Sequence, residues 1–180
     1  MQKIRGIFSY KYTAHIILGL LLLLSLLPIL QMSFYTFPVN DDYVWSGGIH
    51  WNLKYIGFWR IPISLWGTLS SNWFDWQGTF FGAVMMALTP SALFGEQFYF
   101  LTAFTHIIAF LAATYVFTRT VIGKRLSGSG TFFIFSIISF VSLQYLISPR
   151  ESFYWWNGAS YYTLIYTFFL MVLSVKIRIS

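Results

Sequence analysis

The chain has 180 residues, of which 57% are hydrophobic, 22% aromatic and only 9% charged. Soluble domains carry about 25% charged residues, and this chain combines its low charge with a mean hydropathy of +0.67. The composition therefore excludes a soluble, disordered or nucleic-acid-binding protein and predicts an integral membrane protein. The absence of cysteine excludes disulfides, thiolate catalysis and cysteine-based metal sites.

Four apolar stretches predict transmembrane helices. At 1.5 Å per residue, about 20 residues cross a hydrocarbon core of about 30 Å. The first stretch follows a basic N-terminus and is not followed by the small-residue cleavage site of a signal peptide, so we expect it to be retained. The expected spans lie at about residues 12–32, 98–121, 131–147 and 159–175.

The basic residues indicate the orientation of these spans. They cluster before the first span, between the second and third at 119–125, and after the fourth at 176–178. Cytoplasmic loops are enriched in Lys and Arg, so we expect a multi-pass cell-membrane protein with both termini in the cytoplasm. The acidic residues then lie on the outer side. This distribution explains the net charge of +6 without a nucleic-acid partner.

The segment 36–97 is expected to form an outer loop with helices in the membrane interface. It is rich in tryptophan, whose amphipathic ring favours the headgroup level. The apolar run at 79–88 is too short to span unaided and suits an interfacial or re-entrant helix. A crossing by residues 76–94 is the alternative, and the positions of the basic residues argue against it. We therefore predict one all-α membrane domain over 1–180, with about four transmembrane helices plus outer interfacial or re-entrant helices.

Two adjacent carboxylates, Asp41 and Asp42, follow the first span closely. Such a pair is costly to desolvate unless it meets a cation, a metal or hydrogen-bond donors. The pair could hold Mg²⁺ or Mn²⁺ through its oxygens, or one carboxylate could accept a proton from an attacking hydroxyl. The other interpretation is structural, because Asn40 or either aspartate could simply cap an interfacial helix. The sequence leaves both open.

Further polar residues sit among aromatic ones in two outer segments. Aromatic faces with a few hydrogen-bonding groups suit a sugar ring, and an arginine suits a phosphate. A tryptophan and tyrosine belt without any ligand would produce much of the same pattern, and a plain charged loop would explain the Arg-Glu pair. The candidate substrate-binding residues are Asp75, Gln77, Arg150, Glu151, Trp155 and Asn157.

The order of these features resembles the start of the GT-C superfamily of polytopic membrane glycosyltransferases. Four short motifs, namely Asn40-Asp41-Asp42-Tyr43, Trp76-Gln77-Gly78-Thr79, Ala87-Leu88-Thr89-Pro90 and Phe153–Ala159, are similar to those of uncharacterised bacterial membrane proteins of this type. The resemblance implies a polyprenyl-phosphate-linked sugar as donor and a glycan or lipid as acceptor. It also implies that the loop acid, Asp41 or Asp42, is the catalytic base or a metal ligand.

One departure from the GT-C pattern concerns length. Members of the superfamily commonly have many more spans, so we expect this chain to be the N-terminal portion of a longer protein. The alternative is a non-catalytic membrane subunit or flippase-like partner in envelope glycan assembly. Arg150 is our candidate for steadying the leaving phosphate, on the basis of its charge and its expected outer position.

Overall fold

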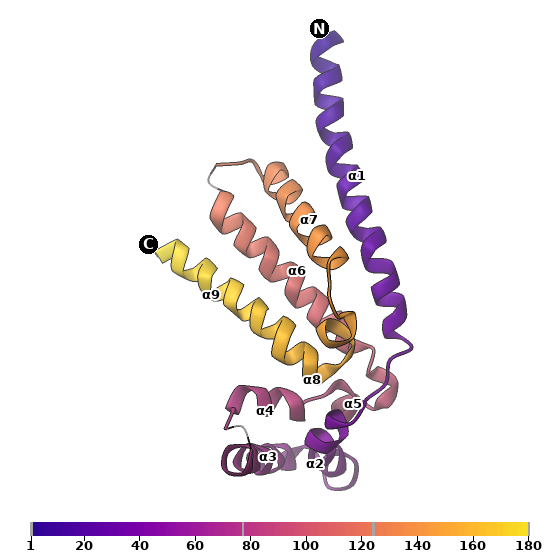
Figure 1. Cartoon of the computed structure of the whole chain (residues 1–180), viewed down its shortest axis with the longest axis vertical. Coiled ribbons are helices and arrows are strands. Elements are labelled where there is room, and N and C mark those ends of the chain that lie inside the picture. The colour runs from indigo at the N-terminus through magenta and orange to yellow at the C-terminus, as the bar shows by residue number, and fades with distance from the viewer. Residues whose placement is uncertain (1, 77, 124, 180) are drawn as a thin grey trace. The chain divides into compact units, whose positions relative to one another are not determined.

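The computed structural model describes residues 2–76, 78–123 and 125–179, with side chains from residue 13 onward. Within this part of the chain every regular element is helical (Figure 1). The α-helices are α1 (Gln2–Ser33), α2 (Asp41–Tyr55), α3 (Ile61–Asp75), α4 (Phe80–Ala87), α5 (Pro90–Phe94), α6 (Leu101–Ile122), α7 (Gly128–Gln144), α8 (Trp156–Ala159) and α9 (Ile165–Ile179). Short 3₁₀ turns form η1 (Phe58–Arg60) and η2 (Glu96–Phe98), and π-helical turns form η3 (Arg150–Tyr154) and η4 (Ser160–Leu164).

Three stretches of the described chain are long and apolar enough to cross a membrane, namely Thr13–Ser33, Glu96–Ile122 and Trp156–Ile179. They correspond to the first, second and fourth expected spans, and they indicate a multi-pass protein associated with a lipid bilayer. The all-α prediction is therefore confirmed for the described residues.

The third expected span differs from its prediction. The helix α7 has 17 residues and is shorter than the three long stretches. It begins inside the Ser-Gly segment, where the Ser127 hydroxyl accepts a hydrogen bond from the Gly130 N–H at 3.3 Å and so caps the helix. It ends at Gln144, so residues 145–147 lie outside it. The helix α7 therefore lies slightly earlier in the chain than the expected span at 131–147, whose crossing of the membrane stays a prediction.

The segment between the first two long stretches forms two 15-residue helices, α2 and α3, and the short helices α4 and α5. Of these, α4 has eight residues and ends before Pro90. A proline cannot continue the hydrogen-bond ladder of a preceding helix, and it starts α5 at its first position. The described residues of 76–94 therefore form no continuous helix that could cross a membrane.

The chain divides into two compact units. The first, called the helix unit below, comprises Met1–Leu30, Ile108–Ile147 and Tyr166–Ser180. In it, the His15 ring Nε2 on α1 lies 2.9 Å from the Ser129 carbonyl oxygen at the start of α7. The Arg178 Nε on α9 donates to the Thr120 hydroxyl on α6 at 3.2 Å.

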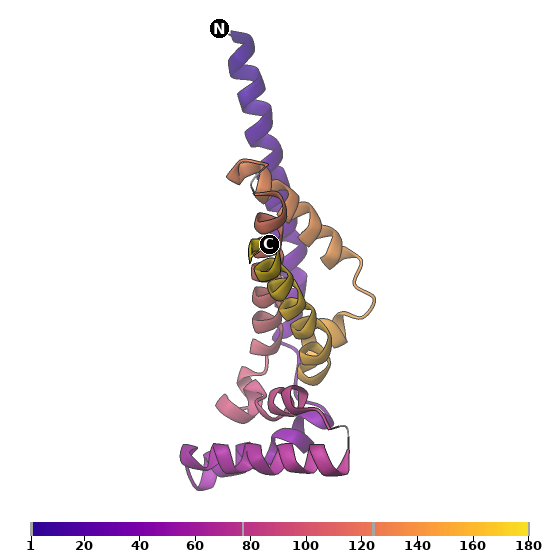
Figure 2. The same cartoon turned by 90° about the vertical axis from the view of Figure 1, so that its left-hand side faces the viewer.

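The second unit, called the site unit, comprises Gln31–Ile107 and Ser148–Ile165. Its small apolar core joins α2, α3, α4 and α5. The axis of α3 runs crosswise to the first turns of α6 (Figures 1 and 2). Both segments belong to the site unit. The core residues are Ile49, Ala87 and Ala92, packed against Leu53, Ile61, Leu65, Leu88 and Leu93.

Candidate functional site

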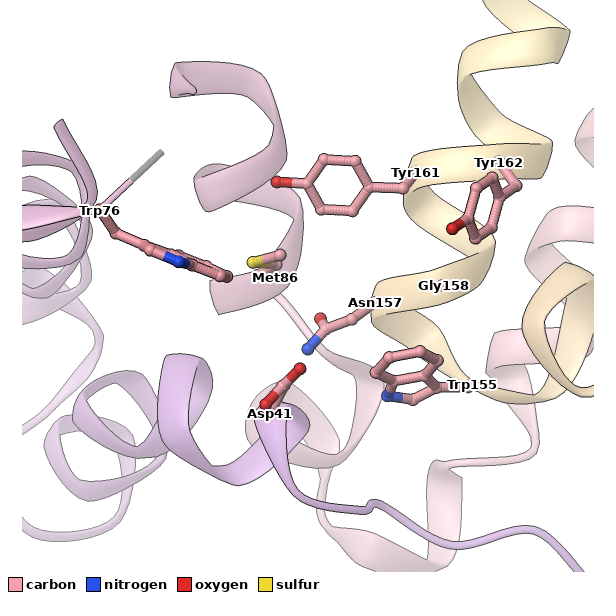
Figure 3. Close-up of a pocket in the computed structure, with 8 residues that line it drawn as sticks. All are labelled: Asp41, Trp76, Met86, Trp155, Asn157, Gly158, Tyr161 and Tyr162. Atoms are coloured by element: carbon pink, nitrogen blue, oxygen red, sulfur yellow. The ribbon is translucent and has the colours of Figure 1, made fainter. Parts of the chain in front are cut away.

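A pocket of about 390 Å³ opens in the site unit. Its lining comes from the start of α2, the end of α3, α4 and the run from η3 to η4, so two segments far apart in the sequence build it (Figure 3). One carboxylate and one primary amide face aromatic walls. The lining residues are Asp41, Trp76, Met86, Trp155, Asn157, Gly158, Tyr161 and Tyr162.

The start of α2 separates the two neighbouring aspartates. The helix begins at Asp41, after Asn40 takes a positive φ of 41°, which is uncommon for a residue other than glycine. Successive residues of an α-helix point about 100° apart. Asp41 is half-buried and lines the pocket, whereas Asp42 is fully buried beside it. Asn40 makes no side-chain capping hydrogen bond, so the capping interpretation does not hold for this residue.

Asp42 is held by hydrogen bonds. The Tyr99 hydroxyl donates to Asp42 Oδ2 at 2.5 Å, and the Val39 backbone N–H donates to the same oxygen at 3.2 Å. The Tyr99 oxygen in turn accepts from the Trp156 backbone N–H at 3.1 Å. Burial raises the pKa of the Asp42 carboxyl above its ordinary value of 3.8, since desolvation outweighs the hydrogen bonds, which act in the other direction. Asp42 thus joins α2 to the turn between η2 and α6, and through Tyr99 to α8.

Trp156 fixes the position of α8. Its indole Nε1–H donates to the Met85 carbonyl oxygen on α4 at 2.5 Å. The ring also packs edge-on against the His106 ring on α6, with centroids 5.1 Å apart. Because both ends of this buried side chain are engaged, the backbone that carries Trp155 and Asn157 has little freedom to move.

Side-chain contacts also hold the side of the pocket that Trp76 and Tyr161 form. Trp76 stacks on Trp45 of α2, with ring centroids 4.9 Å apart and planes 12° apart. The Tyr161 and Thr79 hydroxyl oxygens lie 3.2 Å apart, and the Thr79 N–H donates to Asn72 Oδ1 at 3.0 Å. Asn72 is itself fully buried on α3. The entry into α4 is therefore tied to both α3 and η4.

Asn157 is the polar residue of the pocket with the least access to solvent, being 2% exposed. Within the described part of the chain, neither its Nδ2 nor its Oδ1 has a hydrogen-bond partner. Figure 3 shows its amide and the Asp41 carboxylate pointing toward one another, with the Trp76 and Trp155 indoles on either side. The buried Trp155 Nε1 likewise lacks a partner among the described residues. The pocket thus offers unused hydrogen-bonding groups between aromatic faces.

The structure brings three of the predicted site residues together in the pocket lining and places Asp75, Arg150 and Glu151 elsewhere. Asp41, Trp155 and Asn157 line the pocket. Asp75 is exposed at the end of α3 and accepts from the Ser71 hydroxyl at 3.2 Å. Arg150 and Glu151 are exposed in η3 and do not appear in the lining, and Gln77 lies outside the described residues.

The two carboxylates of the acid pair have different surroundings, and their metal role stays a prediction. Asp42 turns its Oδ2 toward Tyr99, while Asp41 is the one carboxylate among the described lining residues. No group of three His, Asp or Glu residues that could hold a metal ion occurs in the part of the chain that the structure describes. Mg²⁺ binding by proteins relies on oxygen ligands arranged around one point. We therefore derive no step through a metal.

Four residues of the site were not predicted from the sequence. Tyr161 and Tyr162 fell within the expected fourth span, and Met86 within the apolar run before Pro90. Tyr99 fell within the expected second span. A tyrosine at the start of a span places a polar hydroxyl at the membrane face, and this feature of the sequence could have indicated Tyr99. Tyr161 and Tyr162 lie in the π-helical turn η4, and such turns are frequent at functional sites.

Comparison with known proteins found no relative of this chain. No family model matches the chain, and neither a curated protein nor a solved structure matches it.

Proposed function

We propose that the chain belongs to a membrane glycosyltransferase that takes a sugar from a polyprenyl-phosphate donor at the outer membrane face, with Asp41 as catalytic base. The observation that carries the proposal is the pocket itself. It sets a half-buried carboxylate opposite a buried amide and between the indoles of Trp76 and Trp155. A sugar needs apolar ring faces and a few directed polar groups, and this lining supplies both.

The reaction follows from the position of Asp41. An acceptor hydroxyl placed within hydrogen-bond reach transfers its proton to the Asp41 carboxylate as its oxygen attacks the anomeric carbon. A new carbon–oxygen bond forms, the bond from the anomeric carbon to the phosphate oxygen breaks, and the electron pair leaves with polyprenyl phosphate. The described lining holds no cation, so the assignment of the phosphate to Arg150 stays a prediction that rests on its charge alone.

We also propose that α7 is a fourth span. The chain leaves the site unit after Ile107 and enters it again at Ser148. If both parts of the site face the same side of the membrane, α6 and the following segment must cross in opposite directions. The 17 residues of α7 extend about 26 Å, close to a hydrocarbon core of about 30 Å. The helices α2 and α3 are then interfacial helices of the outer face, and both termini are cytoplasmic.

The test is sugar transfer by the full-length protein in membrane vesicles. Polyprenyl-phosphate donors carrying different radiolabelled sugars are supplied, and the product is separated from the donor. We expect the wild-type protein to transfer one of them and Asp41→Asn to reduce transfer by about 10²–10⁴-fold, as expected for loss of a general base. Asp75→Asn is the matched control, because Asp75 is exposed and does not line the pocket.

Two results would contradict the proposal. Wild-type rates in Asp41→Asn would remove Asp41 from the reaction. Absence of transfer with every donor, in a protein that co-purifies with a transferase, would favour the non-catalytic subunit instead.

A further inference from the structure

Asn157 carries an unused recognition group. Its side chain is 2% exposed, and among the described residues its donor Nδ2 and its acceptor Oδ1 both lack partners. Buried polar groups in folded proteins are normally paired, and an unpaired one is costly. A side chain in the wall of a pocket with both groups free is therefore suited to a ligand that supplies one acceptor and one donor.

The surroundings of Asn157 hold it in place. Trp156, its neighbour, is fixed by the hydrogen bond to Met85 and by the backbone bond to Tyr99. Gly158 on the other side has no room for a Cβ, which would approach the Glu151 carbonyl oxygen and the Trp155 ring. The amide is thus fixed from both sides, as a group that selects a ligand by hydrogen bonding must be.

The geometry of a primary amide limits what can pair with it. Its donor and acceptor point the same way from one carbon, so they match two adjacent hydroxyls, each of which can donate or accept. An acetamido group matches less well, because its N–H and C=O point in opposite directions across a trans peptide-like bond. A carboxylate ligand would meet the Asp41 charge across the pocket.

We propose that Asn157 binds two adjacent hydroxyls of the transferred sugar and so selects neutral sugars with an unsubstituted vicinal diol. The inference rests on the proposed function, which it deepens by naming the sugar class. Trp155, whose buried Nε1 is also without a partner among the described residues, lies beside the same subsite.

The test measures binding of methyl glycosides to the full chain in lipid nanodiscs by saturation-transfer NMR. Methyl glucoside, mannoside and galactoside are compared, and then the monodeoxy analogues and the 2-acetamido analogue of the one that binds best. We expect loss of either of two adjacent hydroxyls to weaken binding about tenfold or more, since an unpaired amide group is left behind. In Asn157→Leu the parent glycoside should bind about as weakly as those analogues do.

Asn52→Leu is the matched control, because the Asn52 amide on α2 already donates to the Gly48 carbonyl oxygen at 2.9 Å and is absent from the lining. Equal binding of the deoxy analogues to the wild-type protein overturns the proposal, and this arm needs no variant to fold. So does undetectable binding of every glycoside at millimolar concentration. Hydroxyl-dependent binding without any sugar transfer would contradict the proposed function alone. Transfer without hydroxyl dependence would contradict this inference alone.

Discussion

Asp41 and Asp42 are chemically identical neighbours whose surroundings differ. Asp41 lies at the open side of α2 and faces the pocket, while Asp42 is enclosed by Tyr99, Val39 and the start of α8. A carboxylate that must exchange a proton with a substrate needs access to it. We therefore propose Asp41 as the reactive group and infer a structural role for Asp42 in holding the site together.

The pKa of Asp42 has a consequence for stability. A raised folded-state pKa means that the folded protein binds the proton more tightly than the unfolded chain. The contribution of Asp42 to stability is then greatest at low pH and falls as the pH rises from about the ordinary value of 3.8 through the raised one. We expect the thermal unfolding midpoint in detergent to fall over this pH range. In Asp42→Asn this fall should be smaller. An equal slope in both proteins would contradict the assignment.

The Tyr99 hydroxyl connects Asp42 to Trp156 and can be tested separately. Tyr99→Phe removes the donor to the carboxylate and the acceptor of a backbone N–H, and both groups are buried. Each unpaired buried group costs about 1–3 kcal/mol. We expect a clear fall in the unfolding midpoint measured by scanning calorimetry. Tyr145→Phe, at an exposed position after α7, should leave it unchanged.

At the scale of elements, the pocket depends on how closely α4 and η4 approach. Gly82 on α4 has no side chain, and an added Cβ would collide with the Tyr161 hydroxyl. Gly82→Ala should displace Tyr161 from Thr79 and destabilise the protein by about 1–3 kcal/mol, the usual cost of overpacking.

Gly67→Ala provides the control for Gly82→Ala, because Gly67 lies in α3 with nothing within 4 Å of an added Cβ. Alanine in an open helical position stabilises by about 0.5–1 kcal/mol. The two substitutions should thus move the unfolding midpoint in opposite directions. A rise of equal size in both would show that helix propensity, and not the contact with Tyr161, decides the effect.

The helices were largely predictable from the sequence because apolar length and tryptophan content carry that information. The three long stretches and the break at Pro90 follow from hydropathy and proline chemistry. The π-helical turns η3 and η4 were not predictable, because no local pattern encodes an extra residue in a turn. The site was half predictable: acids and aromatic residues were identified, but which of them meet depends on tertiary packing, as the separate positions of Arg150 and Asp41 demonstrate.

At the scale of the whole molecule, the proposed four-span topology makes a simple prediction. The chain lacks cysteine, so each introduced cysteine provides a single thiol. Ser71→Cys on α3 should react with a membrane-impermeant maleimide in intact cells, whereas Ser129→Cys at the start of α7 should react only after permeabilisation. Both positions are exposed. Labelling of Ser129→Cys in intact cells would contradict the cytoplasmic hairpin.

We propose that sugar transfer occurs in the pocket and uses Asp41. The most direct measurement compares initial transfer rates of Asp41→Asn and Asp42→Asn, expressed at equal levels, with the donor that the wild-type protein accepts. We expect a loss of about 10²–10⁴-fold for Asp41→Asn and retained transfer for Asp42→Asn, whose amide oxygen can still accept from Tyr99. Retained transfer in Asp41→Asn, or loss in Asp42→Asn alone, would contradict it.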